Sequence, residues 1–472
     1  MLKDFSISVI QTLRQRGFQA YLVGGCVRDL LLHREPADFD VATNATPDQV
    51  MEIFPHTYAV GAQFGVVLIP ASGEVAVQPQ DPERTNPIRN DNDNDNATMA
   101  STAGKRTVEV ATFRSDIGYS DGRHPDEVRF SRDPREDVAR RDFTINGMLL
   151  DPLSGPPPGQ VLDYVGGCDD LKAGIIRSIG APEQRFAEDK LRMLRAVRFA
   201  ARFGYSIEPA TFAAIREMAR EIHVVSHERV RDELTRMLTE GRPRDAFLLL
   251  DESGLLGEVL PEISAMHSVE QPPEFHPEGD VFVHTLLLLE NLPHPCPSTL
   301  AWGALLHDVG KPSTFRRAPD RIRFDGHVEV GVKMAEEICR RLRFSNVDTA
   351  QILALVDNHM RFGHATRMSQ ATLKRFLRMP RFDEHLALHR ADALASHRQL
   401  SVYDFVREKL AEIPAETMRP RPLVSGDDLI AAGYAPGPRF REILNAVEDG
   451  QLDGRLPSRD AALDFVRRQF PL

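Results

Sequence analysis

Apolar and polar positions in the first 150 residues alternate in short runs that are typical of strands and short helices. Ala20–Val23 is an apolar run that ends at a glycine pair, and Val27–Leu32 follows it with helical spacing. Phe64–Ile69 and Val108–Phe113 are rich in β-branched and aromatic residues, which predicts two further strands. We therefore expect an α+β N-terminal part, a small mixed sheet with helices.

Beyond residue 160 the apolar positions recur with helical spacing almost to the end of the chain. The clearest helical segments are Glu188–Phe203, His227–Thr239, Val283–Leu292, Leu300–Val309, Val330–Leu342, Ala350–His359 and Ser401–Leu410. The pattern predicts an all-α remainder after the mixed sheet.

Breaks in this pattern divide the chain into four parts. Leu153–Gln160 is rich in proline and glycine and is interpreted as a linker, as is Glu416–Pro422. The stretch 81–106 includes alternating Asp and Asn from Asn90 to Asn96, which cannot bury apolar surface, so a disordered insertion is predicted there. The predicted parts are 1–152, 161–262, 263–412 and 423–472.

Composition excludes several classes of protein. With 472 residues, 42% of them hydrophobic, the chain is long enough for about three domains with ordinary cores. No apolar run reaches the roughly 18–20 residues that span a bilayer, and the N-terminus lacks a secretory pattern, so no membrane partner is expected. Four widely spaced cysteines indicate reduced thiols and a cytoplasmic location. The net charge of −11 argues against non-specific coating of nucleic acid, but it permits a local basic track.

The first candidate chemistry is a pair of aspartates separated by one residue. In a strand, Asp38 and Asp40 share one face while Phe39 and Val41 point to the other. Carboxylates held side by side repel each other unless a dication binds them, and oxygen ligands of this kind suit Mg²⁺ and nucleotidyl transfer. For an isolated pair, a polar strand end is the simpler alternative. Glu109 lies between two valines of another predicted strand, which makes it a candidate third carboxylate ligand.

A glycine pair and an arginine-rich helix supply candidate phosphate contacts. Gly24 and Gly25 allow the backbone to approach a triphosphate, whose charge Arg28 and the following helix start can balance, although such a pair is also an ordinary tight turn. From Arg185 to Arg202 there are six basic and two acidic residues. The residues that recur every three positions, and are expected on one helical stripe, are Asp189, Arg192, Arg195 and Arg198. A solvated amphipathic face is the alternative interpretation.

Five segments in order resemble the motifs of the bacterial CCA-adding enzyme and poly(A) polymerase family. They are Gly24–Asp29, Asp38–Asp40, Glu109–Arg114, Arg140–Gly147 and Glu188–Phe199. The resemblance covers roughly the first 205 residues. It implies that Asp189 and Arg192 read the Watson–Crick edge of the incoming base. It also implies that Arg195 and Arg198 hold the triphosphate with Arg141, and that Asp142 supports the nucleotide and the sheet.

A second resemblance lies in the helical part. The ordered set His284, His307-Asp308 and Asp392 is similar to the metal-dependent HD phosphohydrolase superfamily, and imidazole with carboxylate suits a divalent ion that activates water. Taken singly, each histidine is more simply a surface or core residue. His327 and His359 are candidates for a second metal ion. The two resemblances together imply a nucleotidyltransferase head at 1–152, a helical neck that binds nucleotide and RNA at 161–262, an HD body at 263–412 and a helical tail at 423–472.

We therefore expect a template-independent RNA nucleotidyltransferase that adds CMP and AMP from CTP and ATP to tRNA 3′ ends, with two Mg²⁺ ions held by Asp38, Asp40 and Glu109. Poly(A) polymerase and partial CC- or A-adding activities are the alternatives within the family. The HD set suggests phosphatase or cyclic-phosphodiesterase activity with a divalent metal. An alternative from another class is a phosphohydrolase whose head only binds RNA or nucleotide.

Overall fold

The computed structural model describes residues 2–59, 65–71, 107–117, 127–272, 276–319 and 321–471. The predicted insertion at 81–106 lies outside the described residues. The chain forms two compact units, Met1–Ser226 with Glu252–Leu255, and His227–Asp251 with Leu256–Leu472. Within the part of the chain that the structure describes, no helix has both the length and the apolar character needed to cross a membrane.

The first unit is built on a six-stranded mixed sheet with strand order β3-β4-β2-β1-β7-β8. Only the β2–β4 pair is parallel, and the other neighbours are antiparallel. The α+β prediction is therefore confirmed. The strands of the sheet are β1 (Ala20–Val23), β2 (Asp40–Thr43), β3 (Val66–Pro70), β4 (Thr107–Thr112), β7 (Leu149–Asp151) and β8 (Gln160–Leu162). The two-stranded pairs are β5 (Arg114–Ile117) with β6 (Glu127–Phe130), and β9 (Ile175–Ile176) with β10 (Ser206–Ile207).

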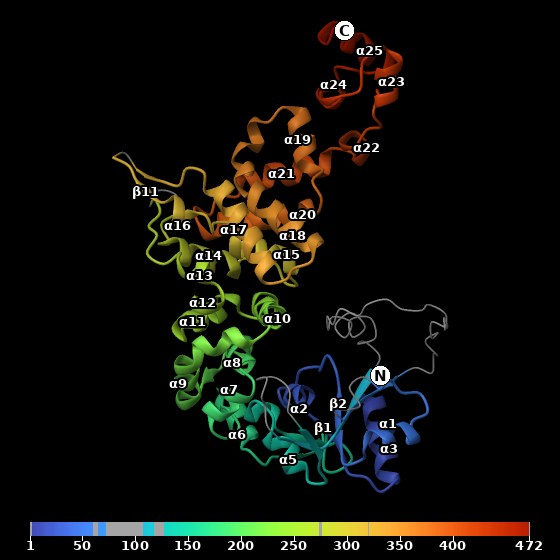
Figure 1. Ribbon diagram of the computed structural model, residues 1–472, viewed down its shortest axis with the longest axis vertical. Coiled ribbons are helices and arrows are strands. Elements are labelled where there is room, and N and C mark those ends of the chain that lie inside the picture. Colours follow the sequence, from blue (N-terminus) through green and yellow to red (C-terminus); the bar gives the residue numbers. More distant parts are fainter. Residues whose placement is uncertain are drawn as a thin grey trace. The chain divides into compact units, whose positions relative to one another are not determined.

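Short helices pack on this sheet, and a helical region follows the sheet in the sequence. Figure 1 shows α1 beside strands β1 and β2, against which it packs. The α-helices of the unit are α1 (Leu2–Gln15), α2 (Gly25–Leu31), α3 (Pro47–Ile53), α5 (Pro134–Ala139), α6 (Gly167–Ala173), α7 (Pro182–Glu188), α8 (Leu191–Phe203) and α9 (Pro209–Met218). The 3₁₀ turns are η2 (Thr144–Asn146) and η3 (Ala219–Val224).

The proline- and glycine-rich run near residue 155 is not a linker, and that interpretation is wrong. It connects β7 to β8, which pair antiparallel with Leu150 opposite Val161. Asp151 holds the turn, because its carboxylate accepts hydrogen bonds from Leu153 N and from the Ser154 hydroxyl. Proline and glycine mark a hairpin as readily as a domain boundary, and only the strand pairing distinguishes the two.

The second unit is almost entirely helical. Its helices are α10 (His227–Thr239), α11 (Pro243–Glu252), α12 (Leu255–Val259), α13 (Pro261–Ser264), α14 (Val281–Glu290), α15 (Ser298–Leu306), α16 (Lys311–Thr314), α17 (His327–Arg341), α18 (Asn346–Asn358), η4 (His359–Arg367), α19 (Gln370–Leu377), α20 (Phe382–Ala395), α21 (Ser401–Glu412), α22 (Ala415–Met418), α23 (Gly426–Ala431), α24 (Pro438–Leu452) and α25 (Arg459–Gln469). A short hairpin, β11 (Arg316–Arg317) with β12 (Ile322–Arg323), interrupts them.

Helix α15 is the centre of this unit. Every residue from Thr299 to Leu306 is buried, because α15 packs against α10, α14, α18 and α20. A helix that is apolar on all sides is expected to lie inside a domain. Since α15 leads directly into His307 and Asp308, its burial fixes these two side chains in the interior.

The final helices have a small core of their own and also dock on the body. Leu429, Ile443 and Val466 are buried in one apolar cluster. The end of α24 is tied to α19, because Lys374 Nζ donates to the carbonyl of Leu452 at 2.6 Å. The tail is thus packed against the helical body.

Candidate active sites: a carboxylate cluster and a histidine–aspartate centre

The carboxylate cluster begins where β2 and β4 run side by side. Asp40 is the register partner of Glu109 in this parallel pair. Phe39 and Val41 are buried on the opposite face, as the alternation predicts. Asp38 precedes β2 and is exposed. The fold therefore brings Asp40 and Glu109 to one face of the sheet, with Asp38 beside them.

Burial and mutual repulsion raise the pKa values of two of these carboxylates, Asp40 and Glu109. Burial, together with the charges of Glu109 and Asp38, raises the pKa of Asp40 to about 7. Partial desolvation and the Asp38 charge also raise the pKa of Glu109, although its side chain stays open to solvent. Arg141 is a nearby cation that offsets part of this repulsion. Three carboxylates gathered in this way form a donor set that favours a bound cation.

Gly24 allows the backbone to come close to this cluster. Its φ of +76° is one that residues with a Cβ rarely adopt, and a Cβ there would lie 3.4 Å from Arg141 Nη1 and 3.8 Å from Asp40 Oδ2. At Gly25, a Cβ would meet Arg28 Nη2 at 3.6 Å. The glycine pair thus lies against both the carboxylates and the neighbouring guanidinium groups.

Arg28 is buried rather than open to solvent. Its Nε donates to Asp29 Oδ1 at 2.9 Å, and its Nη1 donates to Asn146 Oδ1 at 2.7 Å. The side chain therefore connects α2 to η2 as well as lying beside the glycine turn.

Arg141 is oriented by an aspartate that sequence reasoning missed. Asp137 is fully buried, and its carboxylate accepts hydrogen bonds from Arg140 and from Arg141, with Arg141 Nη2 at 2.9 Å. Despite burial, the two arginines hold the pKa of Asp137 below its usual value. An acidic residue three and four positions before two arginines on a short helix is a signal that sequence spacing offers.

Asp142 connects the head to the arginine helix. Its Oδ2 accepts from Arg195 Nε and Nη2 at 2.9 and 2.7 Å, and its Oδ1 accepts from Phe143 N and Asn146 Nδ2. Although burial opposes ionisation, these partners lower the pKa of Asp142 to about 2. Asp142 therefore stays ionised and holds Arg195 in one orientation.

The prediction that Asp189 shares one helix with Arg192, Arg195 and Arg198 is wrong. Asp189 has φ −146° and ψ 105°, which ends α7, and α8 begins at Leu191. Aspartate readily bonds the nearby backbone in place of continuing a helix, and Asp189 Oδ1 accepts from Leu191 N at 3.1 Å. Arg192 donates to Glu188 Oε2 at 2.7 Å and to the carbonyls of Arg185 and Arg140, so its position is fixed.

The remaining arginines gather around two phenylalanine rings. Phe199 and Phe203 are stacked, with centroids 6.2 Å apart. The guanidinium carbons of Arg195 and Arg198 lie 5.3 and 4.3 Å from the Phe199 centroid, and that of Arg28 lies 4.6 Å from the Phe203 centroid. These are cation–π distances. The structure thus brings together three arginines that were predicted to contact phosphate.

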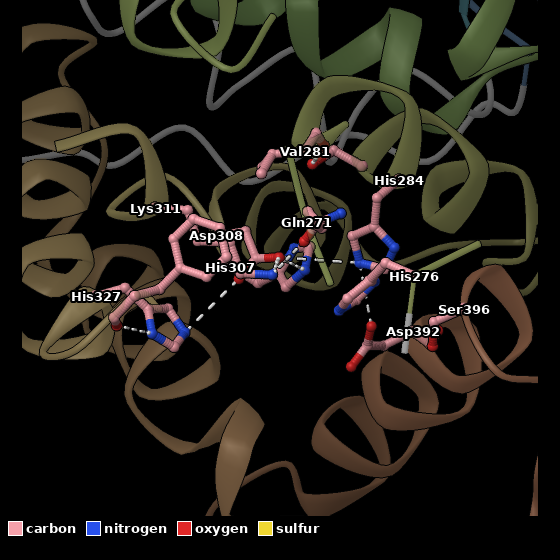
Figure 2. Close-up of polar contacts among 12 residues, drawn as sticks. Gln271, His276, Val281, His284, His307, Asp308, Lys311, His327, Asp392 and Ser396 are labelled. Carbon is pink, nitrogen blue, oxygen red and sulfur yellow. Dashed lines mark hydrogen bonds and ion pairs between the residues drawn. The ribbon is translucent and has the colours of Figure 1, made fainter. Parts of the chain in front are cut away.

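The histidine–aspartate centre lies within the second unit and draws on five helices. Figure 2 shows His327 and Asp392 on opposite sides of the His307–Asp308 pair. The contributing residues are His284 on α14, His307 and Asp308 after α15, His327 at the start of α17, His359 at the start of η4, and Asp392 on α20. All six predicted residues therefore lie in one centre.

These residues form two groups whose ligand atoms lie within 4.8 Å of one another. In the first group, His284 Nε2 is 3.2 Å from Asp392 Oδ1, and His307 is the third member. In the second group, His327 Nε2 and His359 Nε2 are each 3.8 Å from Asp308 Oδ1. Asp308 Oδ2 lies 3.0 Å from His307 Nε2, so this carboxylate lies between the two groups.

Three of these histidines bond a backbone carbonyl through one ring nitrogen and direct the other nitrogen into the site. Nδ1 of His307, His327 and His359 bonds to the carbonyls of Ala304, Phe324 and Val356 at 2.8, 3.0 and 2.7 Å, respectively. A carbonyl only accepts, so Nδ1 carries the proton and Nε2 of the neutral ring has a free lone pair. These Nε2 atoms and that of His284 are buried and face the carboxylates of Asp308 and Asp392 at 3.0 to 3.8 Å. An imidazole lone pair that faces a carboxylate needs a cation between the two, so these Nε2 atoms fit metal ligands.

Four further residues at this centre escaped sequence reasoning. Lys311 Nζ lies 2.7 Å from Asp308 Oδ2 and donates to Gln271 Oε1 at 2.6 Å. Glu278 Oε1 is hydrogen bonded to His276 and to His284. Burial by itself would raise the pKa of Asp308, but the neighbouring His307 and Lys311 hold that pKa well below its usual value. Gln271, His276 and Glu278 lie on an irregular segment, where no periodic pattern marks them.

Comparison with protein-family models finds three matching domains along the chain, and the first and the last of them contain the carboxylate cluster and the histidine–aspartate centre. The poly A polymerase head domain matches residues 20–96 and 81–177, and the "Probable RNA and SrmB- binding site of polymerase A" matches residues 204–266. The HD domain matches residues 281–396. Fold and site therefore define a protein with a nucleotidyltransferase head, an RNA-binding region and an HD domain.

Individual relatives narrow the family. The CCA-adding enzyme of Lactobacillus helveticus is 37% identical over 254 residues, and in that alignment the chain spans about half the length of its relative, 54% of each. The CCA-adding enzyme of Lactococcus lactis subsp. lactis is 30% identical over 460 residues, 96% of this chain and 94% of the other. The crystal structure of Bacillus stearothermophilus CCA-adding enzyme in complex with CTP matches with a TM-score of 0.71 and 25% identity, over 99% and 98% of the two chains. The chain belongs to the CCA-adding enzyme family.

Proposed function

We propose that this protein adds CMP and AMP to the 3′ end of tRNA, completing a CCA terminus without a nucleic-acid template. The observation that carries the proposal is the register of β2 and β4, which places Asp40 and Glu109 side by side next to Arg141. The names of the relatives support CCA addition, and one of them was crystallised with CTP. The four free cysteines fit a cytoplasmic location for this reaction.

The carboxylate cluster fits Mg²⁺. Its donors are hard oxygen atoms, and the pKa of Asp40, about 7, is raised by burial and by the charges of Glu109 and Asp38, both of which a bound dication offsets. Asp38 and Asp40, with Glu109, would hold the metal. When bound, Mg²⁺ supplies charge for the attacking 3′-hydroxyl and for the leaving pyrophosphate.

The residues of the chain bind and orient the nucleotide in this proposal. Arg195 and Arg198, with Arg141, hold the triphosphate, and Asp142 keeps Arg195 aligned through its two hydrogen bonds. Asp189 and Arg192 present a carboxylate and a guanidinium to the base edge, a pairing that can accept A and C. Because Arg192 is fixed by Glu188 and by backbone carbonyls, its donors are held in a defined direction.

The test uses the pure full-length protein with tRNA that lacks CCA and with each labelled nucleotide in turn. We expect incorporation of CMP and then AMP, and its loss in Asp40→Asn. Long A tails on unrelated RNA without use of CTP would replace this proposal with poly(A) polymerase activity. Incorporation of CMP alone or of AMP alone would indicate a partial enzyme.

We further propose that the HD centre is a metal-dependent phosphohydrolase acting on RNA ends or nucleotides. The supporting observation is the set of four buried Nε2 atoms that face the carboxylates of Asp308 and Asp392 at 3.0 to 3.8 Å. His284, His307 and Asp392 would hold one divalent ion, and Asp308, His327 and His359 a second. Such ions, when bound, supply an activated water.

The two activities separate experimentally. Opening of a 2′,3′-cyclic phosphate to the phosphomonoester is expected to disappear in His307→Ala while nucleotide incorporation continues. If Asp40→Ala leaves incorporation unchanged, the role proposed for Asp40 is wrong. If the unmodified protein incorporates no nucleotide, the head only binds its ligands, and the protein is a phosphohydrolase.

A further inference from the structure

One carboxylate in the HD centre holds two histidines at the same time. Glu278 Oε1 lies 2.7 Å from His284 Nδ1 and 2.9 Å from His276 Nδ1. The two imidazole rings meet edge to face, with centroids 4.8 Å apart. Figure 2 shows the His276 ring beside that of His284, near Asp392. Glu278 is thus shared between a residue of the first metal group and a residue outside both HD groups.

The backbone around Glu278 is built to keep it there. Gly279 follows with φ +135°, a conformation that favours glycine. Asp280 then caps α14, because its Oδ1 accepts from Val283 N at 2.9 Å and its Oδ2 accepts from Ser268 N at 2.7 Å. The chain therefore turns just before α14, and this turn places Glu278 beside His284, which lies in the first turn of α14.

His284 differs from the other three histidines in the partner of its Nδ1. His307, His327 and His359 each have a backbone carbonyl there, whereas His284 has a carboxylate. A carboxylate behind a ligating imidazole fixes its tautomer and orientation and raises its basicity as a ligand. Glu278 itself is nearly buried, with 7% of its side chain exposed, so solvent weakens this interaction little.

We propose that Glu278 is a positioning residue of the HD centre, which orients His284 so that its Nε2 joins His307 and Asp392 in binding a divalent metal. The group that contains His284 is then the tighter of the two metal groups. This inference rests on the proposed HD metal site. His276 is a second hydrogen-bond donor to the same carboxylate and does not ligate the metal.

The experiment titrates metal-free full-length protein with Co²⁺ and follows the visible absorption of histidine-bound cobalt. For Glu278→Ala we expect a loss of about 10- to 100-fold in the tighter Co²⁺ affinity and a changed absorption spectrum. Glu278→Gln is expected to lose less, because its amide oxygen still accepts one hydrogen bond. His276→Ala is expected to keep the affinity of the unmodified protein.

A matched control separates positioning from general structural damage. Glu262→Gln removes a carboxylate of the same unit that pairs with Arg341 Nη1 at 2.6 Å, outside the HD set. It is expected to leave the Co²⁺ titration unchanged, whatever it does to the melting temperature. The melting temperature without metal identifies any Glu278 variant that fails to fold, and Glu278→Gln then carries the comparison.

The outcomes distinguish this inference from the function on which it rests. Absence of Co²⁺ binding to the unmodified protein, or equal binding by His307→Ala, would overturn the proposed HD metal site. Normal Co²⁺ binding by both Glu278 variants would overturn the positioning role alone. A Co²⁺ ion lost in His276→Ala would also overturn it, because His276, Glu278 and His284 would then themselves be the ligands of that ion.

Discussion

Asp40 and Glu109 are register partners on the parallel strands β2 and β4, although 68 positions separate them in the sequence. Strand alternation keeps both carboxylates on one face while the neighbouring valines are buried. Parallel pairing of adjacent strands is therefore what assembles the proposed nucleotidyl-transfer site.

This relationship leads to the first prediction, which concerns Asp40. Asp40→Asn keeps the shape of the side chain but removes a charged oxygen ligand. We expect CMP and AMP incorporation to fall by on the order of 100-fold or more, since charge stabilisation is the main contribution of such a site. The measurement is single-turnover incorporation into tRNA that lacks CCA.

Asp48→Asn is the matched control for that measurement, because Asp48 is an exposed aspartate in the first turn of α3. Its incorporation rate is expected to equal that of the unmodified protein. Equal rates for the Asp40 and Asp48 variants would contradict the role given to Asp40.

A second prediction concerns the backbone at Gly24. Gly24→Ala forces a Cβ onto a residue with φ +76° and ψ −136°, at 3.4 Å from Arg141 Nη1. Backbone strain of this kind costs about 1–3 kcal/mol, and the added methyl group lies directly against Arg141 Nη1 and Asp40 Oδ2. We expect a lower free energy of unfolding and a reduced incorporation rate, measured by denaturant titration and by the tRNA assay.

Gly17→Ala provides the comparison, since Gly17 has φ +86° but no atom within 4 Å of the added Cβ. It is expected to lose stability without losing incorporation. A similar loss of incorporation in both variants would show that strain alone, rather than the contact with Arg141, is responsible.

A third prediction follows from the Asp142–Arg195 ion pair. The pKa of Asp142 is lowered from 3.8 to about 2, which corresponds to a contribution of about 2 kcal/mol to folding at neutral pH. Asp142→Asn is expected to lose about that amount in urea titrations at pH 7. Because the pKa is depressed in the folded state, the contribution is present above about pH 4 and is lost as the pH falls toward 2.

The sign of this effect is directly measurable. The difference in unfolding free energy between the unmodified protein and Asp142→Asn should narrow as the pH is lowered from 5 to 3. A difference that stays constant over this range would mean that the ion pair does not set the titration of Asp142. A double-mutant cycle with Arg195→Gln isolates the pairwise part of the energy.

A fourth prediction concerns metal removal at the HD centre. A chelator is expected to stop hydrolysis of a 2′,3′-cyclic phosphate, and added divalent metal to restore it, because in this proposal the attacking water is activated by the metal ions that the Nε2 atoms would hold. His307→Ala should lose hydrolysis in the presence of metal, as measured by formation of the phosphomonoester. His364→Ala, which changes an exposed histidine of η4, is expected to retain it. Hydrolysis that persists in the chelator would rule out a metal-dependent centre.

Sequence by itself determined the local features of this protein. The alternation at Asp40, Val41 and Glu109 predicted which side chains are polar on each strand, because side-chain direction in a strand has a period of two residues. Asp38, expected in the same strand, precedes it. The order of the HD residues along the chain pointed to one centre, and all six residues lie in it. These features depend on residues close together in the chain or on a recognisable order of motifs.

Only the tertiary structure decided which distant groups meet. The pairing of β7 with β8 turned an expected linker into a hairpin, and the extended backbone at Asp189 ended a helix that apolar spacing had continued. The contacts of Glu278 with two histidines depend on a sharp turn at Gly279 that no periodicity marks. Hydrogen bonds and helix packing between residues far apart in the chain set these positions, and a one-dimensional pattern of apolar and polar residues does not encode them.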